Sequence, residues 1–220
     1  MVGVEEREPG RAEFVRQVGH VLADLPRFLV APLHRHHHLR WRADQDEVGA
    51  ELPGDEVISR AQFRATRAVT IDAAPRLVWP WLVQVGAGRA GWYSDDLLDN
   101  LGRPSATEVV PAWQGLRVGQ WVPMSPWGAP TARNAFRVTA FEEPRWLLWT
   151  KTGSSWVWSL TPLPGGKTRL VTRVRVRYDW SRPLEAAFGV VLMEFGDFPM
   201  QRRMLLGIKA RAEALARHPT

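Results

Sequence analysis

The stretch that decides the fold is Ala68-Val-Thr-Ile-Asp-Ala-Ala-Pro-Arg-Leu-Val-Trp-Pro-Trp-Leu-Val-Gln-Val-Gly86, followed after a short turn by Gly91-Trp-Tyr-Ser-Asp-Asp-Leu-Leu-Asp-Asn100. Its first part is rich in β-branched residues and predicts a strand that ends at Ile71. Asp72 is expected to cap a helix that Pro75 opens, because proline suits the first helical position. The stretch predicts a strand over 63–71, a helix over 75–85 and a second, short helix over 95–101.

After a loop over 102–114, alternation of apolar and polar residues predicts strands over 118–124, 134–142, 146–152, 154–162 and 167–178. Trp156, Trp158 and Leu160 share one face of their strand, and in the last strand the arginines at 169, 173, 175 and 177 share the face opposite to Val174 and Val176. A period of two is typical of an antiparallel sheet with one dry and one wet face. The arginine row is therefore expected to face solvent, with phosphate binding as the alternative.

The C-terminal part of the chain predicts helices. A short helix is expected over 184–194, and a last, long helix starts at Gly196 with Asp197 as its N-cap. One side of the long helix carries an apolar stripe made of Phe198, Leu205, Ile208, Ala212 and Leu215, with Met204 beside them. The stripe must face the dry side of the sheet. The predicted fold is α+β, a curved antiparallel sheet that grips a long C-terminal helix, with two short helices after the first strand.

Several motifs in this order resemble the SRPBCC superfamily, the START-like or helix-grip proteins, and in particular an uncharacterised bacterial branch related to polyketide cyclase/dehydrase-like and lipid-transport proteins. The motifs are Leu52-Pro-Gly-Asp55, Trp79-Pro-Trp-Leu-Val-Gln84, Gly91-Trp-Tyr-Ser94, Leu98-Asp-Asn-Leu-Gly-Arg103 and Gly196-Asp-Phe-Pro-Met-Gln-Arg-Arg-Met-Leu205. The resemblance implies a helix-grip domain over 60–217, after an N-terminal extension over 1–59. It also implies a hydrophobic ligand cavity between the sheet and the C-terminal helix, and it supplies no shared catalytic set.

The composition excludes several classes of protein. The chain has no cysteine, so it forms no disulfide, thiolate metal site or cysteine nucleophile. Its net charge of +6 comes from scattered arginines, which argues against a nucleic-acid surface. No run approaches the roughly 20 apolar residues of a membrane span, and the first residues lack the apolar core of a secretion signal. A cytoplasmic protein is expected, with peripheral membrane contact left open and the oligomeric state undetermined.

The N-terminal extension contains two recognisable segments. Apolar residues at helical spacing predict an amphipathic helix over 12–25, formed by Phe14, Val15, Val18, Val21, Leu22 and Leu25. An extended basic segment is expected next, with histidines at positions His34, His36, His37 and His38. Clustered histidines are potential metal ligands, but no carboxylate or cysteine accompanies them. Adventitious metal affinity is the favoured interpretation.

The chain has twelve tryptophans, which suit a thick core or the wall of a ligand pocket. Trp79 and Trp81 diverge by about 200° on a helix, so at most one is expected to face the core directly. Trp92 and Tyr93 follow several glycines, and they either line a gate at the cavity mouth or pack the short helices onto the sheet. The residues expected to contact a ligand are Trp81, Trp92, Tyr93, Asp99, Trp121, Trp158, Val176, Tyr178 and Met204.

Three acidic residues, Asp95, Asp96 and Asp99, are close enough in sequence to suggest metal binding or acid–base work. Because they fall at the start of a short helix, capping and solvation are the favoured roles. No phosphate loop or dinucleotide fingerprint is present, so no cofactor is expected.

Three functions follow from these observations. The first is binding of an aromatic, polyketide-like or lipid-like molecule in a Trp-lined cavity. The second is a polyketide cyclase/dehydrase-like enzyme that uses Tyr93 with Asp95 or Asp99. The third is an interaction module that docks on a membrane surface or a protein partner through its N-terminal segment.

Overall fold

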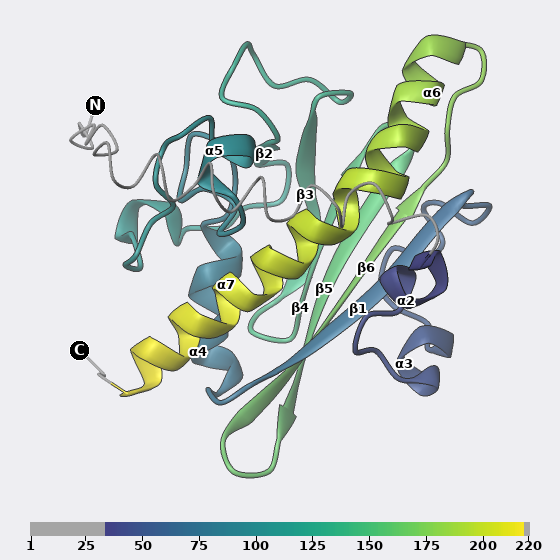
Figure 1. Ribbon diagram of the computed structural model, residues 1–220. Helices are drawn as coiled ribbons and strands as arrows, with labels where there is room; N and C mark the ends of the chain where they lie inside the picture. Colours follow the sequence, from purple (N-terminus) through teal and green to yellow (C-terminus); the bar gives the residue numbers. More distant parts are fainter. Residues whose placement is uncertain (1–33, 218–220) are drawn as a thin grey trace.

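The computed structural model describes residues 34–217. The elements are α2 (Arg35–Leu39), α3 (Gln45–Gly49), β1 (Phe63–Ile71), α4 (Pro75–Val83), α5 (Asp96–Asp99), η2 (Pro111–Trp113), β2 (Trp121–Pro123), β3 (Ala135–Glu142), β4 (Trp146–Lys151), β5 (Ser154–Leu163), β6 (Lys167–Val176), α6 (Pro183–Val191), η3 (Leu192–Gly196) and α7 (Asp197–Arg217). The strands form one antiparallel sheet of six in the order β1-β6-β5-β4-β3-β2. Figure 1 shows the sheet curving behind the long C-terminal helix, so the predicted α+β helix-grip fold is confirmed.

The apolar face of the sheet packs against α7 and α4. Trp149, Trp158 and Leu147 from the sheet are almost completely buried in one cluster with Leu205 and Ile208 of α7. The predicted parity of β5 and β6 is confirmed, because Trp158 lies opposite Thr172 in the register and belongs to the cluster that contains α7. Val176 is partly buried against the same cluster. The tryptophans thus fill the middle of the space between the sheet and the helix.

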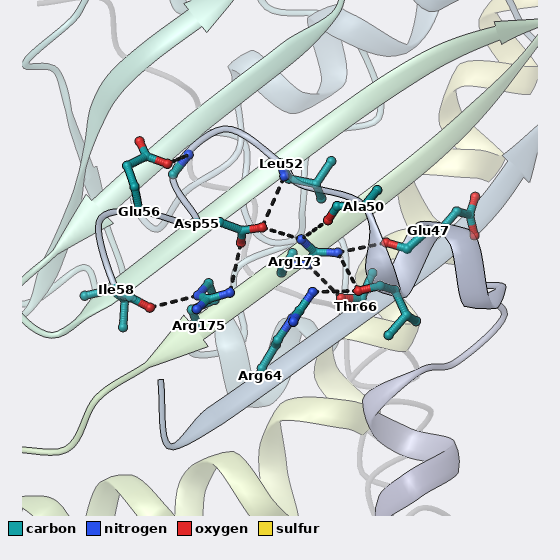
Figure 2. A network of polar contacts seen from close by, with 12 residues as sticks. Glu47, Ala50, Leu52, Asp55, Glu56, Ile58, Arg64, Thr66, Arg173 and Arg175 are labelled. Atoms are coloured by element: carbon teal, nitrogen blue, oxygen red, sulfur yellow. Dashed lines mark hydrogen bonds and ion pairs between the residues drawn. The ribbon is translucent and has the colours of Figure 1, made fainter. Parts of the chain in front are cut away.

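The arginine row lies on the other face of the sheet, and the expectation that it faces solvent is wrong for most of its members. Residues 43–59 cross this face and cover it (Figure 2). Arg169 forms an ion pair with Glu47 at 2.6 Å, and Arg173, whose side chain is 0% exposed, pairs with Asp55 at 2.5 Å. Only Arg177, beyond the end of β6, is exposed. Arg169, Arg173 and Arg175 are covered because residues 42–59 supply carboxylates and backbone carbonyls to their guanidinium groups.

The segment before β1 also packs at the edge of the sheet. The predicted extended segment is instead the short helix α2, and the His38 ring stacks on Phe198 of α7 with centroids 3.9 Å apart. The Trp41 carbonyl accepts a hydrogen bond from the Ala68 amide of β1 at 3.1 Å. The predicted helix over 12–25 lies outside the described residues. The division of the chain at residue 59 stays a prediction, and these contacts join its two sides.

Helix α4 differs from expectation in two respects. Both Trp79 and Trp81 are buried, at 3% and 2% exposure. Trp79 packs near Phe141 of β3 and Trp81 packs edge-on to Tyr93, so the helix is covered on more than one side. The expected cap is also wrong, because Ala74 is the N-cap and Asp72 pairs with Lys167 at 2.7 Å instead.

The three C-terminal elements form one continuous helical rod (Figure 1). Backbone angles at Val191, Leu192 and Asp197 are all helical, with φ of −59° and ψ of −46°. The expectation that Asp197 caps a separate helix is therefore wrong. A π-helical turn, η3, joins α6 to α7 without a break, and such turns are frequent at functional sites.

Candidate functional site

A pocket of about 280 Å³ lies between the ends of β4–β6 and the rod formed by α6, η3 and α7. The sheet contributes Phe136, Trp156, Val174 and Val176 to its lining, while the rod contributes apolar groups that include Ala186 and Met193. Apolar side chains on both walls would shield the apolar surface of a bound organic molecule from water.

Trp156 forms the aromatic wall of the pocket. Its indole N–H donates to Thr172 Oγ1 at 2.8 Å, which fixes the orientation of the ring. Phe136 packs edge-on against it with centroids 5.6 Å apart, and Trp92 stacks on it at 6.0 Å with an interplanar angle of 3°. A ring held from several sides is a preorganised contact surface, because binding costs it little rotamer freedom.

Two polar residues, Asp197 and Gln201, line the other side of the pocket. Asp197 Oδ2 lies 2.7 Å from Nη2 of Arg67, whose side chain is 1% exposed, and Gln201 Nε2 donates to Asp197 Oδ1 at 3.3 Å. Arg67 Nε donates to the His38 carbonyl at 2.8 Å. Among the described residues, Arg67 Nη1 has no hydrogen-bond partner, and the contact of Asp197 Oδ2 is the ion pair with Arg67 Nη2. The pocket therefore places a buried ion pair beside an apolar wall.

Tyr178 lines the same pocket, next to Gly189 of α6. Its ring lies so close to α6 that a Cβ at Gly189 would be 3.5 Å from it. Burial raises the pKa of Tyr178 to about 12, and the carboxylates of Glu194 and Asp197 add to the effect. The hydroxyl has no hydrogen-bond partner within residues 34–217, and it stays a neutral donor at physiological pH.

Charged side chains surround the opening of the pocket. Arg133, Arg177 and Arg182 line it together with Asp179 and Glu185. Lys151 lies over the Phe136 ring, with Nζ 5.1 Å from the centroid, and burial lowers its pKa. The mixed rim gives the opening both donors and acceptors.

Of the residues expected to contact a ligand, Val176 and Tyr178 line this pocket. Trp158, Trp81, Met204 and Trp92 are buried in the central cluster. Trp121 is partly exposed, with the Arg137 guanidinium 4.9 Å from its ring centroid. The structure thus brings together only part of the predicted set.

The glycine-rich approach to Tyr93 is a tightly packed turn. Gly86 and Gly91 form a β-bridge, and a Cβ at Gly91 would lie 2.6 Å from Ser105 Oγ. Tyr93 itself has a φ of 56° and is 4% exposed. A Cβ at Gly207 of α7 would collide with the Tyr93 carbonyl. This close approach favours packing over gating for the aromatic pair.

The Tyr93 hydroxyl is also engaged. It accepts a hydrogen bond from Gln84 Nε2 at 2.9 Å, and the Arg211 guanidinium lies 4.5 Å from the ring centroid. Burial raises the pKa of Tyr93 to about 12. The residue is neutral and fully contacted at physiological pH.

The acidic residues of the second short helix have structural partners. Asp95 caps α5 by accepting from the Leu97 amide, and it pairs with Arg203 at 2.5 Å. Asp96 accepts from Asn100 Nδ2 at 2.6 Å, and Asp99 accepts from the Ser94 hydroxyl. Burial raises the pKa of Asp99. These contacts confirm the capping interpretation for Asp95.

Two further observations concern metals and membranes. The described residues contain no group of three or more histidine or acidic side chains that could hold a metal ion. Between residues 34 and 217, no helix combines the length and the apolar character needed to cross a bilayer.

Sequence reasoning missed Asp197, Gln201 and Trp156 as pocket residues. The alternation of β5 does place Trp156 on the apolar face, so a signal for it existed. Asp197 carries no such signal, because a carboxylate after glycine is also typical of a helix N-cap. Its role depends on Arg67, which is distant in sequence.

No protein-family model matches the chain, and no curated protein matches it. Solved structures with a similar arrangement include a polyketide-cyclase-like protein of Corynebacterium glutamicum, at 16% identity over 71% of this chain and 96% of that one, with a TM-score of 0.38. A protein of Nitrosospira multiformis is 12% identical over 71% and 100% of the two chains, with a TM-score of 0.42. The self-sacrificing resistance protein CalC of Micromonospora echinospora is 15% identical over 69% and 94%, with a TM-score of 0.40. The fold assignment rests on the order and pairing of the chain's own strands and helices, which are those of a helix-grip domain.

Proposed function

We propose that the chain binds a small aromatic or lipid-like molecule in the pocket between β4–β6 and the α6–α7 rod. The observation that carries this proposal is the fixed Trp156 wall, which faces an apolar lining and lies near the Arg67–Asp197 pair. Each 100 Å² of apolar ligand surface buried there contributes about 2.5 kcal/mol before the costs of association. A volume of about 280 Å³ suits a compact molecule rather than a long acyl chain.

We favour binding over the cyclase-like alternative because the side chains expected to be catalytic are engaged in contacts within the protein. Tyr93 bonds Gln84, Asp95 pairs with Arg203, and Asp99 bonds Ser94. None of these residues lines the pocket. A reaction would need other groups, and those that line the pocket include Tyr178 as a neutral donor and the carboxylates of Asp179, Glu185 and Asp197.

Two neighbouring alanines on α6 allow a matched test. Ala186 is 4% exposed and lines the pocket, whereas Ala187 is exposed. The Ala186→Leu variant adds bulk inside the pocket, and the Ala187→Leu variant adds the same bulk outside it. Titration with the neutral aromatic probe 1-aminoanthracene, followed by tryptophan quenching, is expected to give affinity at least about tenfold weaker for Ala186→Leu only. Equal affinities in two folded variants would refute the pocket as the site, and native mass spectrometry of copurifying molecules would then search for another.

A further inference from the structure

Helix α6 presents apolar side chains on two sides. Toward the pocket it offers Ala186 and Gly189. On the outside, large apolar side chains recur at helical spacing, and they are highly exposed: Leu184 at 86%, Phe188 at 69% and Val191 at 55%. We call these three residues the outer face of α6. A helix with apolar side chains on all sides is normally buried, so we expect a partner to cover the outer face.

The chain itself leads to this face. Arg35, in the first described turn, forms an ion pair with Glu194 of η3, with Nε 2.8 Å from Oε2. Glu194 belongs to the π-helical turn that continues directly from α6. The residues before position 34 therefore connect to the structure beside the end of the outer face.

The preceding sequence contains an apolar surface that is long enough to cover the outer face. Residues 12–25 carry the predicted apolar stripe, which has no partner within its own segment. A helix of fourteen residues would be about 21 Å long, and the outer face from Leu184 to Val191 spans about 11 Å. Residues 26–33 can span at most about 26 Å when extended, which is enough to place the stripe on the face.

Charge makes a membrane the less suitable occupant. A surface that docks on anionic lipid needs unpaired basic residues next to its apolar face. Arg182 and Glu185, which flank the start of the outer face, pair with each other at 3.1 Å. We propose that residues 12–25 of the same chain pack their apolar stripe on the outer face of α6.

The absence of cysteine from the chain gives a clean test. A single thiol is introduced by Phe188→Cys on the outer face, or by Val118→Cys at a site of similar exposure, 65%, elsewhere. In the full chain, reaction with a soluble thiol reagent is expected to be at least about tenfold slower for Phe188→Cys. Adding Val18→Glu and Leu22→Glu to the stripe is expected to abolish this difference. Adding His20→Glu and Ala23→Glu instead, which introduces two glutamates on the opposite side of the predicted helix, is expected to preserve it.

A second measurement covers the case in which a stripe variant does not fold. The pair Val21→Cys with Phe188→Cys is expected to form an intramolecular disulfide on mild oxidation, and the pair Val21→Cys with Val118→Cys is not. Fast thiol reaction at both sites in the native background would overturn the proposal, since the face would then be open. Protection that depends on protein concentration would assign the face to a second copy, and protection only with anionic vesicles would assign it to a membrane. Either result would also overturn the proposal.

Discussion

Replacing the buried Arg173 by methionine is expected to reduce the free energy of unfolding by about 3–5 kcal/mol. Its guanidinium donates to Thr66 Oγ1, to Asp55 Oδ2 and to the carbonyls of Ala50, Glu47 and Val48, at distances from 2.5 to 3.1 Å. Burial lowers the pKa of Arg173, but an arginine stays protonated, so the charge cannot be relieved by loss of a proton. A methionine fills the space of the stem and leaves the acceptors without their donor.

The size of this loss in the free energy of unfolding depends on how far the acceptors regain hydrogen bonds after the arginine is removed. Hydrogen bonds to a charged group contribute about 1.5–3 kcal/mol each, and five of them would sum to about 7.5–15 kcal/mol, which is comparable to the whole free energy of unfolding of a domain. Asp55 is 20% exposed and keeps Arg175 at 3.2 Å, so it is partly rehydrated. The expected loss is therefore close to the value for breaking one buried ion pair.

Urea unfolding followed by tryptophan fluorescence measures this loss. The matched control is Arg145→Met, which removes a pair with Glu142 whose arginine is 71% exposed, and which is expected to cost less than about 1 kcal/mol. The Asp55→Asn change is expected to cost less in the Arg173→Met background than in the native one, because the pair is already broken. A loss below about 1 kcal/mol for Arg173→Met would refute the reasoning. It would mean that residues 43–59 do not unfold together with the sheet.

Two further predictions concern the aromatic residues. The Trp92→Ala variant is expected to lose about 3–5 kcal/mol of stability while its affinity for 1-aminoanthracene changes less than about threefold, because Trp92 is 7% exposed and stacks behind Trp156 outside the pocket. The control is Trp127→Ala, at an exposed tryptophan, which should change stability by less than about 0.5 kcal/mol. If Trp92→Ala instead lost affinity with little loss of stability, Trp92 would belong to the site. The two tyrosines of the chain are expected to titrate together near pH 12 in the folded protein, since burial raises the pKa of both to about 12. The folded-state pKa lies above the unfolded value of about 10, so this contribution to stability is fully present below pH 10 and is lost as the pH rises toward 12. The tyrosine titration is followed by tyrosinate absorbance in native and urea-unfolded protein, and the Tyr93→Phe variant assigns each titration step to its residue. A titration step near pH 10 in the native protein would contradict the prediction.

Local patterns were sufficient to predict most of the fold. The alternation through Trp156 and Trp158 identified the buried face of β5, and β1 spans the predicted residues. The arginine row was misjudged because arginines at every second position look the same whether they meet water or a covering segment. Their partners, Glu47 and Asp55, lie more than a hundred residues earlier in the chain.

The candidate site was less predictable than the fold. The conspicuous aromatic pair at 92–93 left a gate and a packing role both open, and the close approach of Gly207 to Tyr93, which favours packing, is a tertiary contact that no local pattern encodes. The pocket instead lies along the α6 half of the rod, between Glu185 and Gln201. Its polar part needs Arg67 of β1 to meet Asp197 of α7, which depends on the path of the whole chain.

The π-helical turn over Leu192–Gly196 has a consequence for how this molecule tolerates insertions and deletions. A turn closed by i→i+5 hydrogen bonds holds one residue more than an α-helical turn over nearly the same rotation about the axis, so the extra residue is absorbed within the turn. Loss of a single residue within 192–196 would therefore leave regular α-helix there and keep Leu184 and Phe188 close to their present direction. Loss of Val190, inside α6, would instead rotate the preceding part of that helix by about 100° and carry Ala186 out of the pocket. A one-codon deletion at the π-turn is therefore expected to preserve the side of α6 that faces the ligand, whereas the same deletion two residues earlier would exchange it.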